Sequence, residues 1–165
     1  MDSQVTVTIF TDLQCGDCAR FDALLNASLL PAYRGRVRFV HKDFPLPKHS
    51  WARPAAILAR RFDQLACGLA ASWRTFLLNR IAETSPDSLP DRAREFAVSA
   101  GVDPAAVLTA LNDPQLAAAV DADIRDGLAR SVAKTPTVFV NNEAFIEDVP
   151  LPAISAAIDR ALAHA

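Results

Sequence analysis

The chain has 165 residues, of which 51% are hydrophobic, and its formal net charge is -2. This length can bury the core of a single domain, and a charge so close to zero gives no reason to expect nucleic acid or an anionic membrane as a partner. No apolar run approaches the roughly 20 residues of a transmembrane helix, so the sequence predicts no membrane span.

The N-terminal part predicts a strand, a helix and a second strand. Residues 5–10 alternate Val and Ile with Thr and Phe, which indicates a strand covered on both faces. From residue 15 to residue 29 the apolar residues recur at helical spacing, until Pro31 and Gly35 break the pattern. Residues 37–44 predict the second strand. A strand–helix–strand order implies a parallel pair joined by a right-handed crossover.

A long stretch rich in helical patterns follows. It predicts helices over residues 52–65 and 68–82 (one interrupted helix or two), 89–100, 105–111 and 115–129. Gly101 ends the third of these regions. Asp103-Pro104 and Asp113-Pro114 each place an N-cap residue before a proline of the first turn.

The C-terminal part predicts a hairpin and a last helix. Residues 137–140 and 144–146 flank Asn141-Asn142, and asparagines tolerate the left-handed backbone of a tight turn. Asp148 is predicted to cap the last helix, whose apolar stripe runs from Leu151 to Leu162. The element order predicts an α/β fold: a mixed sheet in one domain over residues 1–165, with a helical insertion at about residues 52–130.

Cys15-Gly16-Asp17-Cys18 lies between the first predicted strand and the first predicted helix. Two cysteines three residues apart on a first helical turn share one face and can form a disulfide. The first cysteine lies at the positive end of the helix dipole, which favours the thiolate that attacks disulfides. This arrangement predicts a redox pair of catalytic cysteines. The third cysteine, Cys67, lies in an apolar context and is predicted to be a buried structural thiol.

Three motifs resemble the DsbA-like branch of the thioredoxin superfamily, and the resemblance covers nearly the whole chain. They are Phe10-Thr11-Asp12-Leu13-Gln14-Cys15-Gly16-Asp17-Cys18, Phe39-Val40-His41-Lys42-Asp43-Phe44-Pro45-Leu46 and Thr135-Pro136-Thr137-Val138-Phe139-Val140-Asn141. The resemblance implies a thioredoxin-like fold, β-α-β then β-β-α with a helical insertion. It also implies a cis peptide at Pro136 beside the cysteine pair, with the Thr135 backbone presented to an extended substrate by strand addition.

The resemblance further implies a protein thiol–disulfide oxidoreductase in which Cys15 attacks and Cys18 resolves the mixed disulfide. No organic cofactor and no metal are expected, because the electrons are stored in the disulfide. The expected partners are protein or peptide thiols and disulfides and an unidentified redox partner protein, with the chain itself a monomer. DsbA-like members usually act outside the cytoplasm, so a periplasmic or other extracytoplasmic location is favoured. The sequence opens on strand-like residues rather than a signal segment, which leaves the cytoplasm open.

Two departures from the family pattern concern redox tuning. The family often has a buried carboxylate six residues before the nucleophile, and this chain has Ile9 there. Strong oxidants of the family have Pro-His between the cysteines, whereas this chain has Gly16-Asp17. A carboxylate opposes the neighbouring thiolate, so we expect the pKa of Cys15 to be nearer to ~7 than to ~3.5. The potential should then lie below about -120 mV, toward about -200 mV or lower.

Several alternatives stay open from the sequence alone. The main one is a non-catalytic thioredoxin-fold module that binds a peptide or protein. A glutathione-dependent relative is disfavoured because such proteins typically lose the second cysteine, and an isomerase because no segment resembles a dimerisation domain. A zinc site would need Cys67 and His41 or His49 to converge on the pair.

Other polar and aromatic residues receive structural interpretations. Asp12 is expected to cap the active-site helix or hold its loop, and His41 and His49 are interpreted as polar residues rather than catalytic bases. Trp51, Trp73 and Phe76 suit core packing better than a peptide groove.

Overall fold

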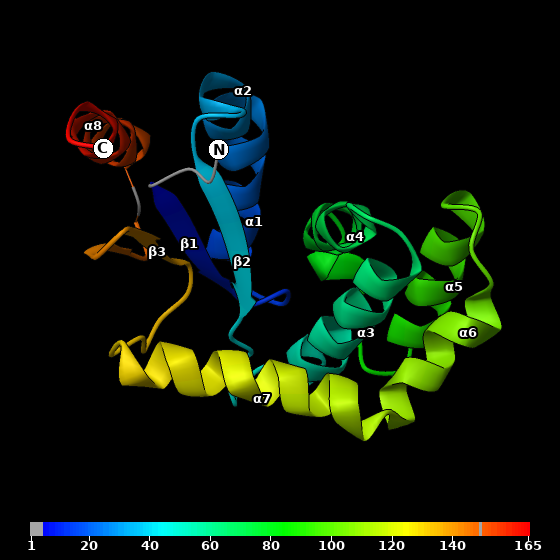
Figure 1. The fold of residues 1–165 in the computed structure, drawn as a ribbon. Coiled ribbons are helices and arrows are strands. Elements are labelled where there is room, and N and C mark those ends of the chain that lie inside the picture. Colours follow the sequence, from blue (N-terminus) through cyan, green and yellow to red (C-terminus); the bar gives the residue numbers. More distant parts are fainter. Residues whose placement is uncertain (1–4, 149) are drawn as a thin grey trace.

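A four-stranded mixed sheet forms the centre of the computed structural model, which describes residues 5–148 and 150–165 (Figure 1). The strand order is β2-β1-β3-β4. The strands are β1 (Thr6–Thr11), β2 (Arg38–Asp43), β3 (Thr137–Val140) and β4 (Glu143–Ile146). The sheet places the two halves of the chain side by side, because β1 pairs with β2 on one side and with β3 on the other.

The strand pairings confirm the predicted connections at both ends of the chain. β1 and β2 are parallel, in a register that runs from Thr6 opposite Arg38 to Thr11 opposite Asp43. β3 and β4 form the predicted antiparallel hairpin. Asn141 in its turn has a φ of +52°, the left-handed conformation that asparagine tolerates.

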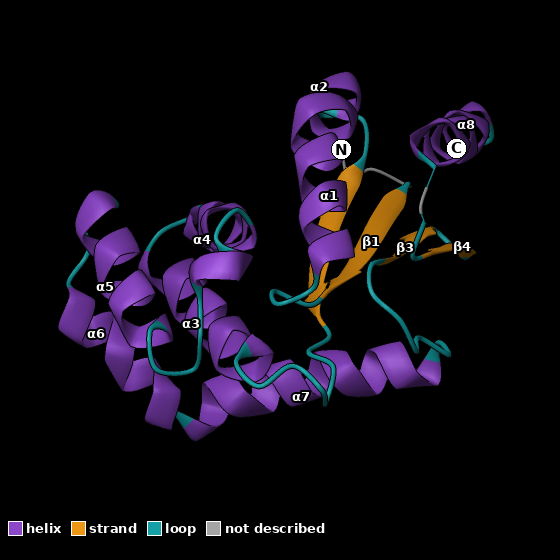
Figure 2. Cartoon of the chain, turned by 180° about the vertical axis from the view of Figure 1, so that it is seen from behind, coloured by secondary structure: helices purple, strands orange, loops and turns teal. Residues whose placement is uncertain are grey.

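Helices occupy the predicted regions, with small changes at their ends (Figure 2). The α-helices are α1 (Gly16–Leu24), α2 (Leu30–Tyr33), α3 (Ala52–Leu65), α4 (Leu69–Leu78), α5 (Leu89–Ser99), α6 (Pro104–Leu108), α7 (Pro114–Ala129) and α8 (Leu151–Ala163). A π-helical segment, Leu25–Leu29, joins α1 to α2, and short 3-10 segments span Ile81–Glu83 and Thr109–Asn112. Helices α3 to α7 all lie between β2 and β3 in the chain.

Of the four residues predicted to begin or end helices, three are confirmed and one is wrong. Asp103 and Asp113 accept hydrogen bonds from backbone N–H groups of α6 and α7, as N-caps should. Gly101 follows α5 with a φ of +72°. The prediction for Asp148 was wrong: α8 starts after Pro150, which is its N-cap and has no side chain able to accept a hydrogen bond.

Both faces of the sheet are covered by helices. Val7 and Ile9 of β1 pack in one apolar cluster with α1, the π-helical segment and α8. Phe10 and Phe139 point to the opposite face, where they form a cluster with Phe44 and Val132. Helix α7 crosses this second face (Figures 1 and 2).

Gly127 of α7 lets the helix approach that aromatic cluster. A Cβ at this position would lie 2.6 Å from the Phe44 ring, closer than real Cβ contacts, and 3.0 Å from the Phe10 ring, which is tighter than most of them. The absence of a side chain at Gly127 therefore allows α7 to pack closely against the sheet.

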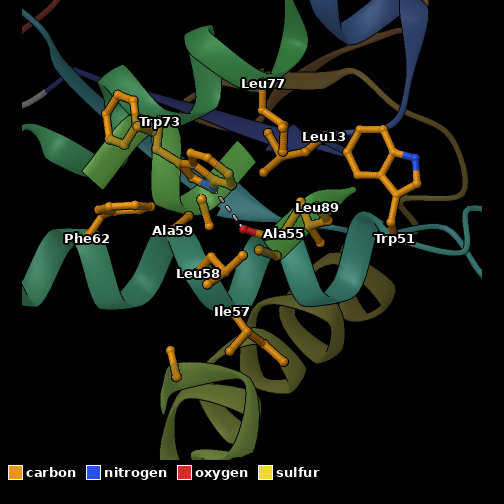
Figure 3. Close-up of a cluster of buried hydrophobic side chains, with 14 of the residues drawn as sticks. Leu13, Trp51, Ala55, Ile57, Leu58, Ala59, Phe62, Trp73, Leu77 and Leu89 are labelled. Carbon is orange, nitrogen blue, oxygen red and sulfur yellow. Dashed lines mark hydrogen bonds between the residues drawn. The ribbon is translucent and has the colours of Figure 1, made fainter. Parts of the chain in front are cut away.

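A separate apolar cluster fills the space between the helices of the insertion (Figure 3). Trp73 is completely buried there and its indole N–H donates to the carbonyl oxygen of Ala55 at 3.0 Å. Trp51 is buried in the same cluster, so both tryptophans have the predicted core role. Cys15 and Cys18 also belong to this cluster. The cysteine pair is thus held where the insertion meets the end of β1.

Candidate functional site

Cys15 and Cys18 are both free thiols at the start of α1. Cys15 is the N-cap residue, with extended backbone, and Cys18 lies in the first turn. Cys15 is 8% exposed and Cys18 2%. The loop after β1 and the first helical turn therefore bring the two thiols together and leave Cys15 the more accessible of the two.

A groove of about 630 Å³ opens in front of Cys15. Its walls come from residues 15–17, 46–49 and 133–135 and from Glu147. We call this the cysteine groove. A smaller hollow of about 420 Å³ adjoins it, and it shares Asp17 and Glu147 with the groove. An extended segment of another molecule can therefore reach Cys15 along the surface.

Thr135, which precedes Pro136, contacts Cys15 from 120 residues away in the chain. The Thr135–Pro136 peptide is cis, the conformation that the resemblance implied. Cys15 Sγ lies 3.4 Å from the carbonyl oxygen of Thr135. The Thr135 hydroxyl is buried and has no hydrogen-bond partner among the described residues. It is therefore available to the thiolate form of Cys15.

The pKa of Cys15 is lowered to about 6. The main cause is a hydrogen bond from the Cys18 thiol, and a hydrogen bond from Thr135 acts in the same direction. Burial opposes both, as does the negative charge of Asp12. The value is nearer to ~7 than to ~3.5, as the sequence predicted, so much of Cys15 is thiolate near neutral pH.

The pKa of Cys18 is shifted in the opposite direction. Burial raises it far above its ordinary value, and the neighbouring Cys15 adds to the shift. The backbone N–H of Asp12 donates to Cys18 Sγ at 3.5 Å, the contact that partly offsets this effect. Cys18 therefore keeps its proton while Cys15 loses one.

Asp17 and Gly16, the two residues between the cysteines, lie at the rim of the groove. The Asp17 carboxylate is exposed and forms an ion pair with Arg20. A Cβ added at Gly16 would meet no atom within 4 Å. The carboxylate that acts on Cys15 is instead the buried Asp12.

Asp12 ties the loop before Cys15 to the segment after β2. Its Oδ1 accepts from the backbone N–H of Gln14 at 2.7 Å. Its Oδ2 accepts from the backbone N–H of Leu46 at 2.7 Å and lies 2.7 Å from His49 Nδ1. The sequence predicted that Asp12 caps the helix or holds its loop, but it did not indicate a partner 37 residues away.

Other residues considered from the sequence lie away from the cysteine pair. Cys67 is exposed, which contradicts the buried role predicted for it. It lies in the turn between α3 and α4, where the neighbouring apolar side chains do not cover it. Ile9 is buried in the sheet cluster. Asp43 bonds to Arg60 and Arg74 rather than to either cysteine.

Two other kinds of site are not found among the described residues. No group of three or more His, Cys, Asp or Glu side chains there has the arrangement to hold a metal ion. None of the helices within residues 5–148 and 150–165 is both long and apolar enough to cross a membrane.

The family model described as Thioredoxin matches residues 1–160. Among solved structures, α-DsbA1 of Wolbachia pipientis is similar at a TM-score of 0.84 and 16% identity, over 99% of this chain and 88% of that one. BdbD of Bacillus subtilis is similar at 0.80 and 21% identity, over 98% and 89%. The thiol-disulfide exchange protein α-DsbA2 of Wolbachia pipientis is similar at 0.81 and 18% identity, over 96% and 82%. No curated protein sequence matches the chain.

Proposed function

Because the chain belongs to the thioredoxin family and has the fold of DsbA-like proteins, we propose that it is a thiol–disulfide oxidoreductase acting on protein substrates. In this reaction the Cys15 thiolate attacks a substrate disulfide and forms a mixed disulfide. Cys18 then attacks Cys15 Sγ, releases the substrate thiol and closes the Cys15–Cys18 disulfide. The reverse sequence oxidises a substrate dithiol. Electrons are stored in the cysteine pair, so the cycle requires no organic cofactor.

The contrast between the two thiols carries this proposal. Cys15 has a lowered pKa and lines an open groove. Cys18 has a raised pKa and is almost completely buried. A nucleophile must be ionised and reachable, whereas a resolving thiol needs only to reach the mixed disulfide that forms beside it.

Thr135 and Pro136 form the proposed binding site for the substrate backbone. Thr135 lines the groove beside Cys15, and Pro136 follows it directly before β3 begins. An extended substrate segment laid along this wall would add a strand, so its backbone supplies affinity without requiring a particular sequence. We also propose that Gly16 and Asp17, at the groove rim, tune the reduction potential of the pair, in addition to the effect of the Asp12 charge on the pKa of Cys15.

The proposed partners are protein thiols and disulfides, together with a redox partner protein that restores the working form of the pair. We propose a monomer acting outside the cytoplasm. The solved structures with this fold include a periplasmic thioredoxin-like protein from Salmonella enterica serovar Typhimurium, at 19% identity and a TM-score of 0.79. Its location is the basis for this part of the proposal.

The first experiment is to measure the reduction potential of the Cys15–Cys18 pair. The protein is equilibrated in glutathione buffers, free thiols are trapped, and the Cys15→Ser variant is the control that cannot close the disulfide. A potential clearly above about -230 mV indicates an oxidant, and one near about -270 mV a reductant of the thioredoxin type. A pair that never forms a disulfide would contradict the proposal and leave the non-catalytic binding module.

A further inference from the structure

Asp12 and His49 are titratable side chains that thiol–disulfide exchange by the cysteines alone does not use. His49 Nδ1 lies 2.7 Å from Asp12 Oδ2. The Asp12 side chain is fully buried, whereas the His49 side chain is 18% exposed. One edge of the imidazole ring is therefore held against a carboxylate, while part of the side chain remains exposed to solvent.

The contacts of Asp12 fix which nitrogen of His49 carries a permanent proton. Both carboxylate oxygens already accept backbone N–H groups, from Gln14 and Leu46. A carboxylate offers only acceptors to its neighbours, so the ring must donate from Nδ1. Nε2 is then the nitrogen that gains or loses a proton, as in other histidines oriented by a carboxylate.

His49 lines the cysteine groove together with Cys15. The titratable or charged groups that face it there are Asp12, Cys15, Asp17, Lys48, Lys134 and Glu147. Among these, Asp17 pairs with Arg20, and Glu147 with Lys134 at 2.8 Å. Among side-chain types, histidine is the one that ordinarily exchanges a proton near neutral pH. His49 is the residue in the groove whose type does so.

Strand β1 has no acid–base side chain at the position that precedes the cysteine pair by six residues. β1 carries Ile9 six residues before Cys15, and this side chain is buried among apolar neighbours. The buried carboxylate nearest along the chain is Asp12, which is already fully bonded. A proton that moves during exchange therefore has in His49 a carrier that lines the same groove as Cys15.

We propose that His49, positioned by Asp12, is the acid–base residue of the exchange reaction, an inference that rests on the function proposed above. As the Cys15 thiolate attacks a substrate disulfide, a bond forms between Cys15 Sγ and one substrate sulfur and the substrate S–S bond breaks. The departing sulfur takes the electron pair as a thiolate, and His49 Nε2 gives it a proton. In the reverse step the neutral ring takes the proton of an attacking substrate thiol.

The test compares two disulfides that differ in whether the departing thiolate needs to be protonated. One is a cystine-linked peptide dimer, whose alkyl thiolate leaves with an ordinary pKa of ~8.5. The other is an aromatic nitrobenzoate disulfide, whose acidic thiolate leaves without protonation. The variants are His49→Gln and, as matched control, His164→Gln at the exposed C-terminal end. Single-turnover rates of the reduced protein are measured with each disulfide.

We expect His49→Gln to slow reaction with the peptide dimer about tenfold and to leave the aromatic disulfide unaffected. This is less than the ~10²–10⁴-fold of full acid–base catalysis, because a thiolate is already a stable leaving group. His164→Gln should match the unmodified protein with both. Equal rates with the peptide dimer, or an equal loss with both disulfides, would overturn the role of His49.

A second measurement uses the unmodified protein, so it does not depend on a variant that folds. The ratio of the two rates is followed over the pH range in which histidines titrate. The proposal requires the peptide dimer to lose rate relative to the aromatic disulfide as pH rises. A ratio independent of pH would contradict it. If neither disulfide reacts with the unmodified protein, the proposed function itself fails.

Discussion

Asp12 follows the last residue of β1 and Asp43 is the last residue of β2, so two buried carboxylates lie at the same end of neighbouring parallel strands. A histidine is close to each of them: His49 contacts Asp12, and His41 precedes Asp43 on β2. The two regions therefore start from the same residue types. They differ in what else reaches the carboxylate.

Arginines reach Asp43 and are absent from the described contacts of Asp12. Arg60 Nε donates to Asp43 at 2.8 Å, and Arg74 at 3.1 Å. Asp123 of α7 joins this network through Arg60 and through the backbone N–H of Asp43 at 2.8 Å. Permanent cations from α3 and α4 thus attach the insertion to β2.

The different surroundings of the two histidines follow from this difference in the partners of the carboxylates. With Asp43 bonded to arginines, His41 Nδ1 is buried without a partner among the described residues. Burial, then the positive charge of Arg74, lowers the pKa of His41 to about 3. His49 instead has the carboxylate to itself apart from backbone donors. A carboxylate bonded to guanidinium groups connects elements of the fold, whereas one bonded to an imidazole positions a group that can exchange protons.

The largest expected effect comes from breaking the network that Asp43 forms with Arg60 and Arg74. Asp43→Asn leaves Arg74 as an uncompensated buried charge, so we expect the free energy of unfolding to fall by about 3–5 kcal/mol. Urea denaturation measures it. The matched control is Asp121→Asn, which removes a half-exposed ion pair with Arg53 and should cost about 0–1 kcal/mol. Equal losses in the two variants would show that burial of the Asp43 network adds nothing.

The second prediction concerns pH and His41. Its pKa is lowered on folding, so below pH ~6.5 the unfolded chain binds a proton that the folded chain refuses. Stability should therefore fall as pH drops from ~6.5 toward about 3, by about 1.4 kcal/mol per pH unit for this group. His41→Gln should remove that part of the slope. Chemical denaturation at a series of pH values measures it, and an unchanged slope would contradict a buried neutral His41.

The third prediction concerns Asp12, the carboxylate that contacts His49. Asp12→Asn removes a carboxylate held by backbone N–H groups and His49, and we expect a loss of about 1–3 kcal/mol, smaller than for Asp43→Asn. Unlike Asp43→Asn, it should also lower the pKa of Cys15 below about 6, because the charge of Asp12 raises that pKa. Thiolate absorbance against pH gives the second readout. A higher pKa in the variant would refute the assigned sign.

The smallest expected effect is that of Thr135→Val. This variant keeps the shape of the side chain and removes the hydroxyl that hydrogen-bonds to the Cys15 thiolate. The pKa of Cys15 should rise, by less than about one unit, or ~1.4 kcal/mol. Thr137→Val, which removes the hydroxyl bonded to the carbonyl of Lys134, is the control and should leave the pKa unchanged. Equal shifts would assign the effect to packing.

The sequence alone determined the elements and the place of the cysteine pair at the start of the first helix. Alternating strand residues, the Asp-Pro helix starts and the Asn-Asn turn all act between residues close in the chain, and the structure follows them. Cys15-Gly16-Asp17-Cys18 is a signal of the same kind, since its chemistry depends on spacing within one helical turn. The Asp148 cap failed because proline can start a helix without a side-chain acceptor.

Only the tertiary structure decided how the polar groups pair. Asp12 meets His49 across 37 residues, and Asp123 bonds to the backbone of Asp43 across 80. Cys67 is exposed despite its apolar neighbours, since burial depends on which elements pack over a turn. Periodicity identifies the faces of single elements, but the partner of a buried charge is set by how those faces come together in space.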